Sequence, residues 1–206
     1  FVLPSLIAAL VKHNGSIRRG DLISVIRTLY PFLKAELFLK WQDDELKDQI
    51  CAYVDALINA KLIAADAEDH LISPAPNSED HNQLVVLAAP VMQSLERYYM
   101  TLALITQRGS GNISIRQVEE LSHLVGQRLS VLYEFNSPEF FDKALFQSFM
   151  KVLTQQGYIR NNEDNAIVFD ENFQNVAQYA NLVLDDVTLQ MLQHITTFSD
   201  EELKDT

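Results

Sequence analysis

DDELKDQICAYVDALINAKLI, residues 43–63, contains a helical pattern of apolar residues that recurs later in the chain. These residues lie three or four positions apart, on one face of a helix: Leu46, Ile50, Tyr53, Val54 and Leu57. An offset of 96 residues superposes the last four on Phe146, Phe149, Met150 and Leu153. The pattern predicts a helix from about residue 43 to 60 and a matching helix from about residue 137 to 156.

Two more helices precede each of these. The first ends at a Gly-Ser pair in both halves, in ALVKHNGSI (9–17) and ALITQRGSGNI (103–113), as a glycine C-cap favours. The second is DLISVIRTLY (21–30) in one half and VEELSHLVGQRLSVLYEF (118–135) in the other. After the third helix, a polar, turn-forming run separates two β-type dipeptides, which predicts a hairpin at the end of each half.

Three helices followed by a hairpin resemble a winged helix, so we predict a mainly α fold with short β-hairpins. It comprises two winged-helix-like units plus a C-terminal helix, divided as residues 1–81, 82–171 and 172–206. A connecting helix is expected over 82–95, kinked or restarted at Pro90. Since identity between the halves is low, convergence of the helix pattern is the alternative to a duplication.

LYPFLKAELFLKW (29–41) is unusually apolar for a surface helix. Pro31 disfavours a helical Tyr30 and lacks an N–H, so we expect the second helix to end there and a new helix to begin. Its large apolar residues do not fit on one narrow face: Phe32, Leu33, Leu37, Phe38 and Trp41. This helix is therefore expected to contact a second apolar neighbour besides its own core.

Charge is unevenly spread along this acidic chain, whose net charge is −12. Residues 1–40 hold six basic and two acidic side chains, although the rest of the chain is strongly acidic. The basic block meets either the acidic remainder of the same chain or an anionic partner. Arg18, Arg19 and Arg27 join the apolar residues above as candidate interface residues.

Several function classes are disfavoured. The predicted helix at 43–60 carries five acidic residues, which would repel nucleic-acid phosphate, so no nucleic-acid binding is expected. No two of the five histidines are three or four residues apart, and no metal or cofactor site is predicted. Cys51 is expected to be a small packed thiol. The sequence lacks an uncharged apolar run of about 18 residues, so we expect no transmembrane helix in this chain.

RTLYPFLKAELFLKW (27–41) and GQRLSVLYEFNSPEFFDKALF (126–146) resemble the C-terminal region of bacterial, membrane-associated glycerol-3-phosphate acyltransferases. Further similar segments, such as IRRGDLI (17–23) and LITQRGS (104–110), are collinear and extend the resemblance over most of the chain. The resemblance implies a parent enzyme that transfers an acyl group from acyl-CoA or acyl carrier protein to the sn-1 hydroxyl of glycerol 3-phosphate.

The catalytic signature of that family is a histidine followed, after four residues, by an aspartate, with the histidine as general base. The fifth residue after each histidine here is another type: Arg18, Ala75, Val86, Arg128 and Ser199. No catalytic residue is therefore predicted in this chain. The resemblance implies an upstream acyltransferase domain in the same polypeptide, working at the cytoplasmic face of the inner membrane.

Within NSPEFFDK (136–143), residue types suit the start of a helix. Ser137 suits the N-cap and Pro138 the first helical position, while Phe140 and Phe141 are expected to enter a core or an interface. We assign this motif a structural role.

Two functions follow from the sequence. The first is an accessory domain that supports the catalytic domain or membrane attachment, with an anionic membrane surface or acyl carrier protein as further candidate partners. The alternative is a non-enzymatic protein-interaction module of tandem winged helices.

Overall fold

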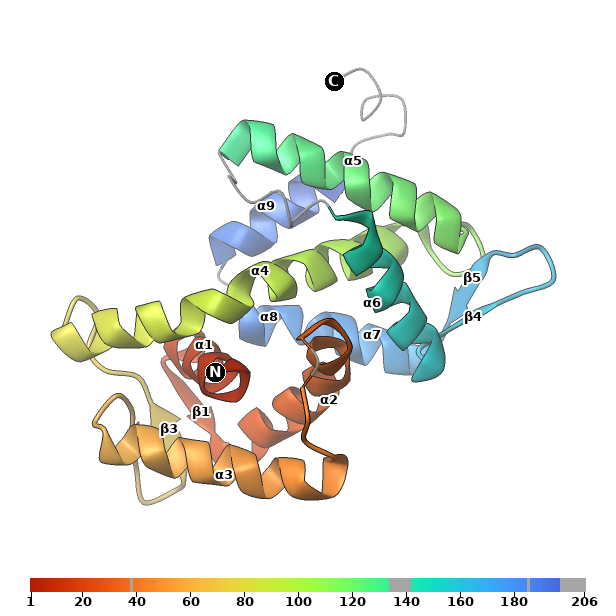
Figure 1. The fold of residues 1–206 in the computed structure, drawn as a ribbon. Helices are drawn as coiled ribbons and strands as arrows, with labels where there is room; N and C mark the ends of the chain where they lie inside the picture. The colour runs from red at the N-terminus through yellow and green to blue at the C-terminus, as the bar shows by residue number, and fades with distance from the viewer. Residues whose placement is uncertain (38, 134–141, 185, 197–206) are drawn as a thin grey trace. The chain divides into compact units, whose positions relative to one another are not determined.

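The computed structural model describes residues 1–37, 39–133, 142–184 and 186–196. These residues are mainly helical and include two small antiparallel sheets (Figure 1). They divide into two compact units, Phe1–Gln93 and Ser94–Thr206. The division falls inside one long helix, α4 (Glu79–Arg108), so each unit contains part of it.

The first unit contains three further helices and three short strands. In chain order these are α1 (Val2–Asn14), β1 (Ser16–Arg18), α2 (Arg19–Leu37), α3 (Asp43–Asn59), β2 (Ala64–Ala65) and β3 (His70–Ile72). The strand order is β1-β3-β2, with Ile17 opposite Leu71 and Ala64 opposite Ile72. The hairpin of β2 and β3 confirms the prediction, whereas β1 was not expected.

The second unit has the same order of helices followed by a hairpin, but its sheet has two strands. It holds α5 (Ile115–Tyr133), α6 (Lys143–Gln155), β4 (Ile159–Asn161), β5 (Ile167–Phe169), α7 (Glu171–Gln178), α8 (Ala180–Val183) and α9 (Asp186–Thr196). β4 and β5 form the second predicted hairpin. A single bridge, Ser114 to Ala166, lies at the positions equivalent to Arg18 and His70 of the first unit.

Backbone conformations also repeat at the offset of 96 residues. Lys61 and Gly157, which follow the third helix of each unit, have φ angles of 60° and 75°. Asp69 and Asn165, in the hairpin turns, have φ angles of 61° and 59°. The two halves therefore share their backbone conformation at these two turns.

Helix ends follow local chemistry. α1 ends before Gly15, whose φ of 68° provides the positive-φ C-cap that the sequence predicted. α5 begins with a capping box, in which the Gln117 N–H donates to Ser114 Oγ and the Ser114 N–H donates to Gln117 Oε1. Asp142 caps α6 by accepting a hydrogen bond of 2.8 Å from the Ala144 N–H.

The predicted helix end at Pro31 was wrong, and the helix that contains Pro90 does not restart there. α2 continues through Pro31 to Leu37. α4 runs from Glu79 through Pro90 to Arg108, so the connecting helix predicted at 82–95 is part of α4. Burial explains the continuity of α2, because Leu29, Tyr30, Phe32 and Leu33 on both sides of Pro31 are at most 2% exposed. Packing of these side chains outweighs the missing hydrogen bond.

Candidate functional site

The predicted apolar interface divides into buried and exposed residues. Phe32 and Leu33 are 2% and 0% exposed, so they belong to the core of the structure and are unavailable to a partner. Leu37 is 38% exposed and Trp41 is partly buried. Phe38 lies outside the described residues. Among the described apolar residues of the predicted interface, Leu37 and Trp41 are therefore the two that a partner could reach.

Trp41 is fixed to α2 by backbone hydrogen bonds. The Tyr30 hydroxyl accepts from the Trp41 N–H at 3.1 Å, and Lys34 Nζ donates to the Trp41 carbonyl at 2.9 Å. Lys40 Nζ lies 4.3 Å from the centroid of the Trp41 ring, within the range of a cation–π contact. The chain after α2 therefore folds back against the helix.

Arg19 bridges two other segments of the first unit. Its guanidinium donates to Asp55 on α3 and to Asp69 in the hairpin turn, each at 2.9 Å. The hydrogen bond to Asp55, with a further contribution from Asp69, raises the pKa of Arg19. Part of the basic block therefore pairs with acidic residues of the same chain, whereas Arg18 and Arg27 are exposed on the surface.

Four predicted residues, Ser137, Pro138, Phe140 and Phe141, lie outside the described residues, and their structural role stays a prediction. Cys51 is a free, partly buried cysteine. Among the residues that the structure describes, no group of three or more His, Cys, Asp and Glu side chains is placed to hold a metal ion.

A small hollow of about 270 Å³ in the second unit carries charged groups from α5 and α6. Its lining includes Glu119, His123 and Lys143. Two of these side chains already form polar contacts. Glu119 accepts a hydrogen bond from Gln147 at 3.2 Å, and His123 Nε2 lies 3.1 Å from the Gln127 amide. These contacts are those of a solvated helix face.

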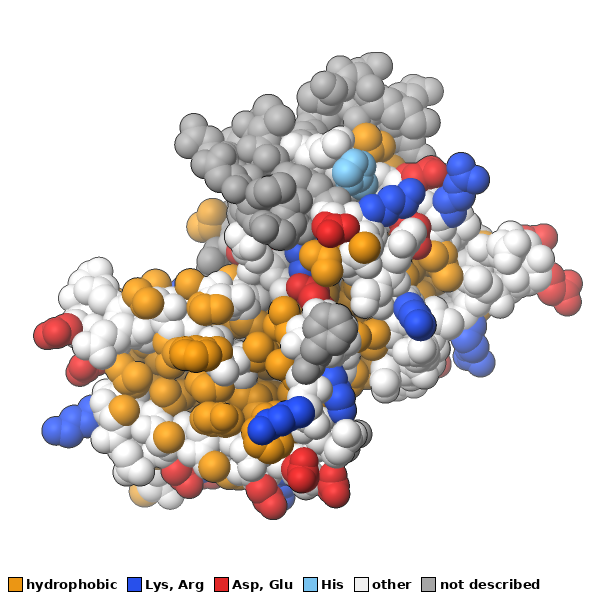
Figure 2. Space-filling model, viewed as in Figure 1, with side chains coloured by type: hydrophobic (Ala, Val, Ile, Leu, Met, Phe, Trp, Pro, Cys, Tyr) orange, Lys and Arg blue, Asp and Glu red, His pale blue; other side chains and the backbone are white. Residues whose placement is uncertain are grey.

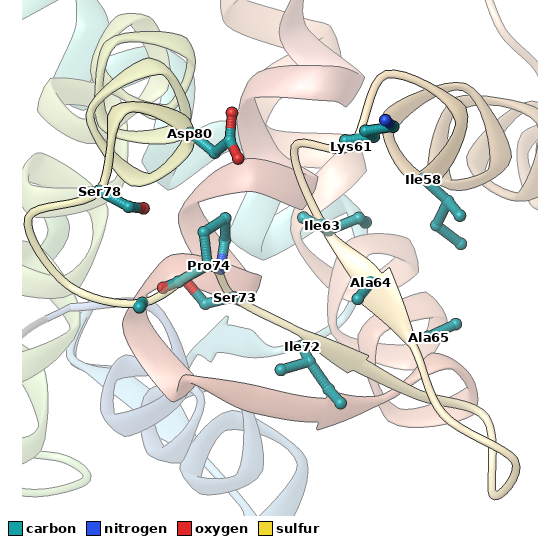
Figure 3. Close-up of a pocket in the computed structure, with 11 residues that line it drawn as sticks. Ile58, Lys61, Ile63, Ala64, Ala65, Ile72, Ser73, Pro74, Ser78 and Asp80 are labelled. Carbon is teal, nitrogen blue, oxygen red and sulfur yellow. The ribbon is translucent and has the colours of Figure 1, made fainter.

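A larger apolar hollow, which we call the hairpin groove, lies in the first unit between the ends of α3 and α4 and the strands β2 and β3 (Figure 3). Its volume is about 620 Å³. Its apolar lining includes Ile58, Ile63, Ala64, Ala65, Ile72 and Pro74. Lys61 and Asp80 lie on opposite sides of it. Figure 2 shows hydrophobic side chains gathered on the face between α3 and the first part of α4.

The sequence prediction missed this groove although its lining lies between residues 58 and 80, because the apolar residues there were assigned to a helix end and a hairpin and not to a surface. A signal was nevertheless present. At an offset of 96 residues, Ala64 and Ala65 correspond to Arg160 and Asn161, and Pro74 corresponds to Asp170. A comparison of the two halves for exposed positions that change from apolar to polar would have identified it.

Two tyrosines of the second unit are perturbed by their surroundings. The Tyr99 hydroxyl is buried, and burial raises the pKa of Tyr99 above its ordinary value, with Tyr179 adding to the effect. The pKa of Tyr158 is raised by the same two causes. Both side chains therefore remain neutral at physiological pH, as packed tyrosines do.

Helices of the described segments are each too short or too polar to cross a membrane.

Sequence comparisons identify the relatives of this chain. The family described as "Glycerol-3-phosphate acyltransferase C-terminal region" matches residues 1–162. A glycerol-3-phosphate acyltransferase of Pseudomonas paraeruginosa is 38% identical over 180 residues, covering 87% of this chain and 22% of the relative. One of Ectopseudomonas mendocina is 37% identical over 163 residues, covering 79% and 20%. One of Pseudomonas entomophila is 34% identical over 178 residues, covering 86% and 21%.

No solved structure matches the chain significantly. The chain spans about one fifth of the length of the curated relatives that it matches. Because the family match covers most of the chain, the chain belongs to the glycerol-3-phosphate acyltransferase C-terminal region family.

Proposed function

We propose that this chain is an accessory region of a glycerol-3-phosphate acyltransferase whose catalytic residues lie upstream in the same polypeptide. The parent enzyme transfers an acyl group from acyl-CoA or acyl carrier protein to the sn-1 hydroxyl of glycerol 3-phosphate, the first step of phospholipid biosynthesis. It works at the cytoplasmic face of the bacterial inner membrane. The family match over residues 1–162 carries this proposal.

The chemistry of this chain fits a supporting role. Acyl transfer to a hydroxyl requires a general base that is held in place by a second group. None of the five histidines is followed, after four residues, by an aspartate. The hairpin groove of the first unit is lined mainly by apolar side chains, with Lys61 and Asp80 at opposite sides, which suits packing against a partner.

Acyl-transfer assays of the 206-residue chain and the full-length parent protein test the proposal. With radiolabelled glycerol 3-phosphate and palmitoyl-CoA, the full-length protein should form lysophosphatidic acid, whereas the isolated chain should form none. Turnover by the isolated chain would show that it contains a catalytic centre and would refute the accessory role. A full-length protein that is inactive with both acyl-CoA and acyl carrier protein as the acyl donor would refute the assignment to this reaction.

Contact with an anionic membrane is a second candidate role. It is supported by Leu37, which is 38% exposed, and by the partly exposed Trp41 with Lys40 over its ring. Tryptophan and lysine are typical of membrane interfaces. Co-sedimentation of the chain with vesicles of anionic phospholipid should fall in the Leu37→Glu and Trp41→Ala variants. Unchanged sedimentation of both variants would remove this surface from consideration.

We further propose that each unit is winged-helix-like. Support comes from the order of elements in the first unit, which is helix, strand, two helices and a hairpin. Such a unit would also suit a protein-interaction module without an enzymatic parent. A histidine followed after four residues by an aspartate, in the sequence preceding Phe1, would discriminate in favour of the enzyme.

A further inference from the structure

The two units provide an internal comparison for the hairpin groove. At equivalent positions of the hairpin, the first unit has Ala64 and Ala65, and the second has Arg160 and Asn161. All four residues are exposed. Since the second unit forms its hairpin with polar side chains there, the fold does not require apolar ones. The first unit therefore carries apolar side chains at positions where the fold accepts polar ones, which leaves them available for contact with a partner.

The openness of the groove argues against a small ligand. Ala64, Ala65 and Ala75 line it and are nevertheless exposed, so a small molecule bound there would keep much of its surface in water. Binding sites for small molecules usually enclose most of the ligand. A polypeptide segment covers such a shallow surface more effectively.

The charges around the groove argue against an anionic membrane. α4 begins with Glu79 and Asp80, and the turn between β2 and β3 adds Glu68, whereas Asp69 of that turn is paired with Arg19. Lys61 is the single basic residue among those that line the groove. Anionic headgroups would be repelled by this surface. An apolar segment with neighbouring lysine or arginine residues would complement both the apolar floor and the acidic surroundings.

We propose that the hairpin groove is the docking site for an apolar segment, flanked by basic residues, of the upstream acyltransferase part of the same polypeptide. This inference rests on the proposed function. The relatives extend far beyond this region, because the matched part is 22% of the relative from Pseudomonas paraeruginosa. A segment joined to the chain has a high effective concentration, in the millimolar range for short flexible linkers, so even a shallow groove is filled.

Thiol accessibility tests the proposal at one residue of the groove. In a Cys51→Ser background, Ala65→Cys places a thiol in the groove, and Asn161→Cys places one at the equivalent position of the second unit. Labelling with a charged maleimide is compared between the full-length protein and the 206-residue chain. We expect Ala65→Cys to react about tenfold more slowly in the full-length protein, because a covered thiol is protected. Asn161→Cys should react equally in both.

Three outcomes would overturn the proposal. Equal labelling of Ala65→Cys in both proteins would show that the groove stays open. Slower labelling only after addition of anionic vesicles would identify the membrane as the occupant. Slower labelling of the isolated chain at rising protein concentration would identify a second copy. Acyl transfer by the unsubstituted full-length protein separates the two claims: an active enzyme with an open groove refutes only the docking site, whereas an inactive enzyme refutes the proposed function.

Discussion

Asp66 and Asn162 occupy equivalent turns, and each side chain holds its hairpin in the same way. Asp66 Oδ1 accepts from the N–H groups of Glu68 and His70, both at 2.9 Å. Asn162 Oδ1 accepts from the N–H groups two and four residues further on, at 3.0 and 2.8 Å. Asp66 differs in its charge, and its Oδ2 lies 3.2 Å from His70 Nδ1. The hydrogen bond from the His70 N–H is the main cause that lowers the pKa of Asp66.

Substitution of Asp66 should separate the hydrogen bonds from the charge. Asp66→Ala loses the two hydrogen bonds that Oδ1 accepts and should lower the melting temperature, whereas Asp66→Asn keeps them and should lower it less. Thermal denaturation of both variants measures this. Equal losses for Ala and Asn would contradict the geometry, because the second unit uses asparagine at this position.

The lowered pKa of Asp66 also predicts a pH dependence. A lowered folded-state pKa means that the ionised carboxylate is favoured by folding. The stabilisation is therefore complete above the ordinary value of 3.8 and is lost as the pH falls through the lower folded-state pKa. The stability difference between the native chain and Asp66→Asn should shrink in that acidic range. A difference that grows on acidification would contradict the assignment.

At the scale of whole elements, α2 and α5 form a natural pair. Both contain 19 residues and begin at equivalent positions, Arg19 and Ile115. Pro31 of α2 corresponds to Gln127 of α5. Gln127 is therefore a residue that an equivalent helix accommodates at this position in place of proline.

Pro31→Gln should stabilise the first unit. Proline in a helix interior costs up to about 3 kcal/mol relative to good helix formers, and part of this should be recovered. Urea denaturation of the 206-residue chain would detect the gain as a higher midpoint. A clear loss of stability would instead show that the ring of the partly buried Pro31 packs in a way that glutamine cannot replace.

Gly15 and Gly20 form a matched pair around β1. A Cβ at either position meets no atom within 4 Å, but Gly15 has a φ of 68° whereas Gly20 lies in α2 without positive φ. Gly15→Ala should cost about 1 kcal/mol, and Gly20→Ala should gain about 0.5–1 kcal/mol. Thermal melts of the two variants compare these effects directly, and shifts of the same sign would contradict the helix boundaries.

The sequence predicted the main elements where patterns were long or conformationally specific. The apolar face that includes Ile50 and Phe146, the Gly-Ser helix ends and both hairpins are present in the structure. Local rules failed where tertiary contacts outweighed them, as at Pro31. β1 was missed because its partner β3 is distant in sequence, so no hairpin turn marks Ser16–Arg18 as a strand.

At the scale of the whole molecule, the structure changes which surface is expected to meet a partner. The apolar stretch at 29–41 mostly fills the core, and Arg19 pairs with Asp55 and Asp69. The hairpin groove, whose lining lies within residues 58–80, is the larger apolar surface and was missed by the sequence prediction. A prediction from sequence therefore located the apolar residues but could not distinguish core from surface, because both share the same residue types.

The central claim is that this region supports an acyltransferase without contributing its general base. In the full-length protein, each histidine is replaced in turn by glutamine: His13, His70, His81, His123 and His194. Steady-state kinetics with glycerol 3-phosphate should give a nearly unchanged kcat for all five folded variants. Loss of a general base costs about 10²–10⁴-fold in rate. A loss of that size in any one of these variants, with the fold intact, would contradict the account.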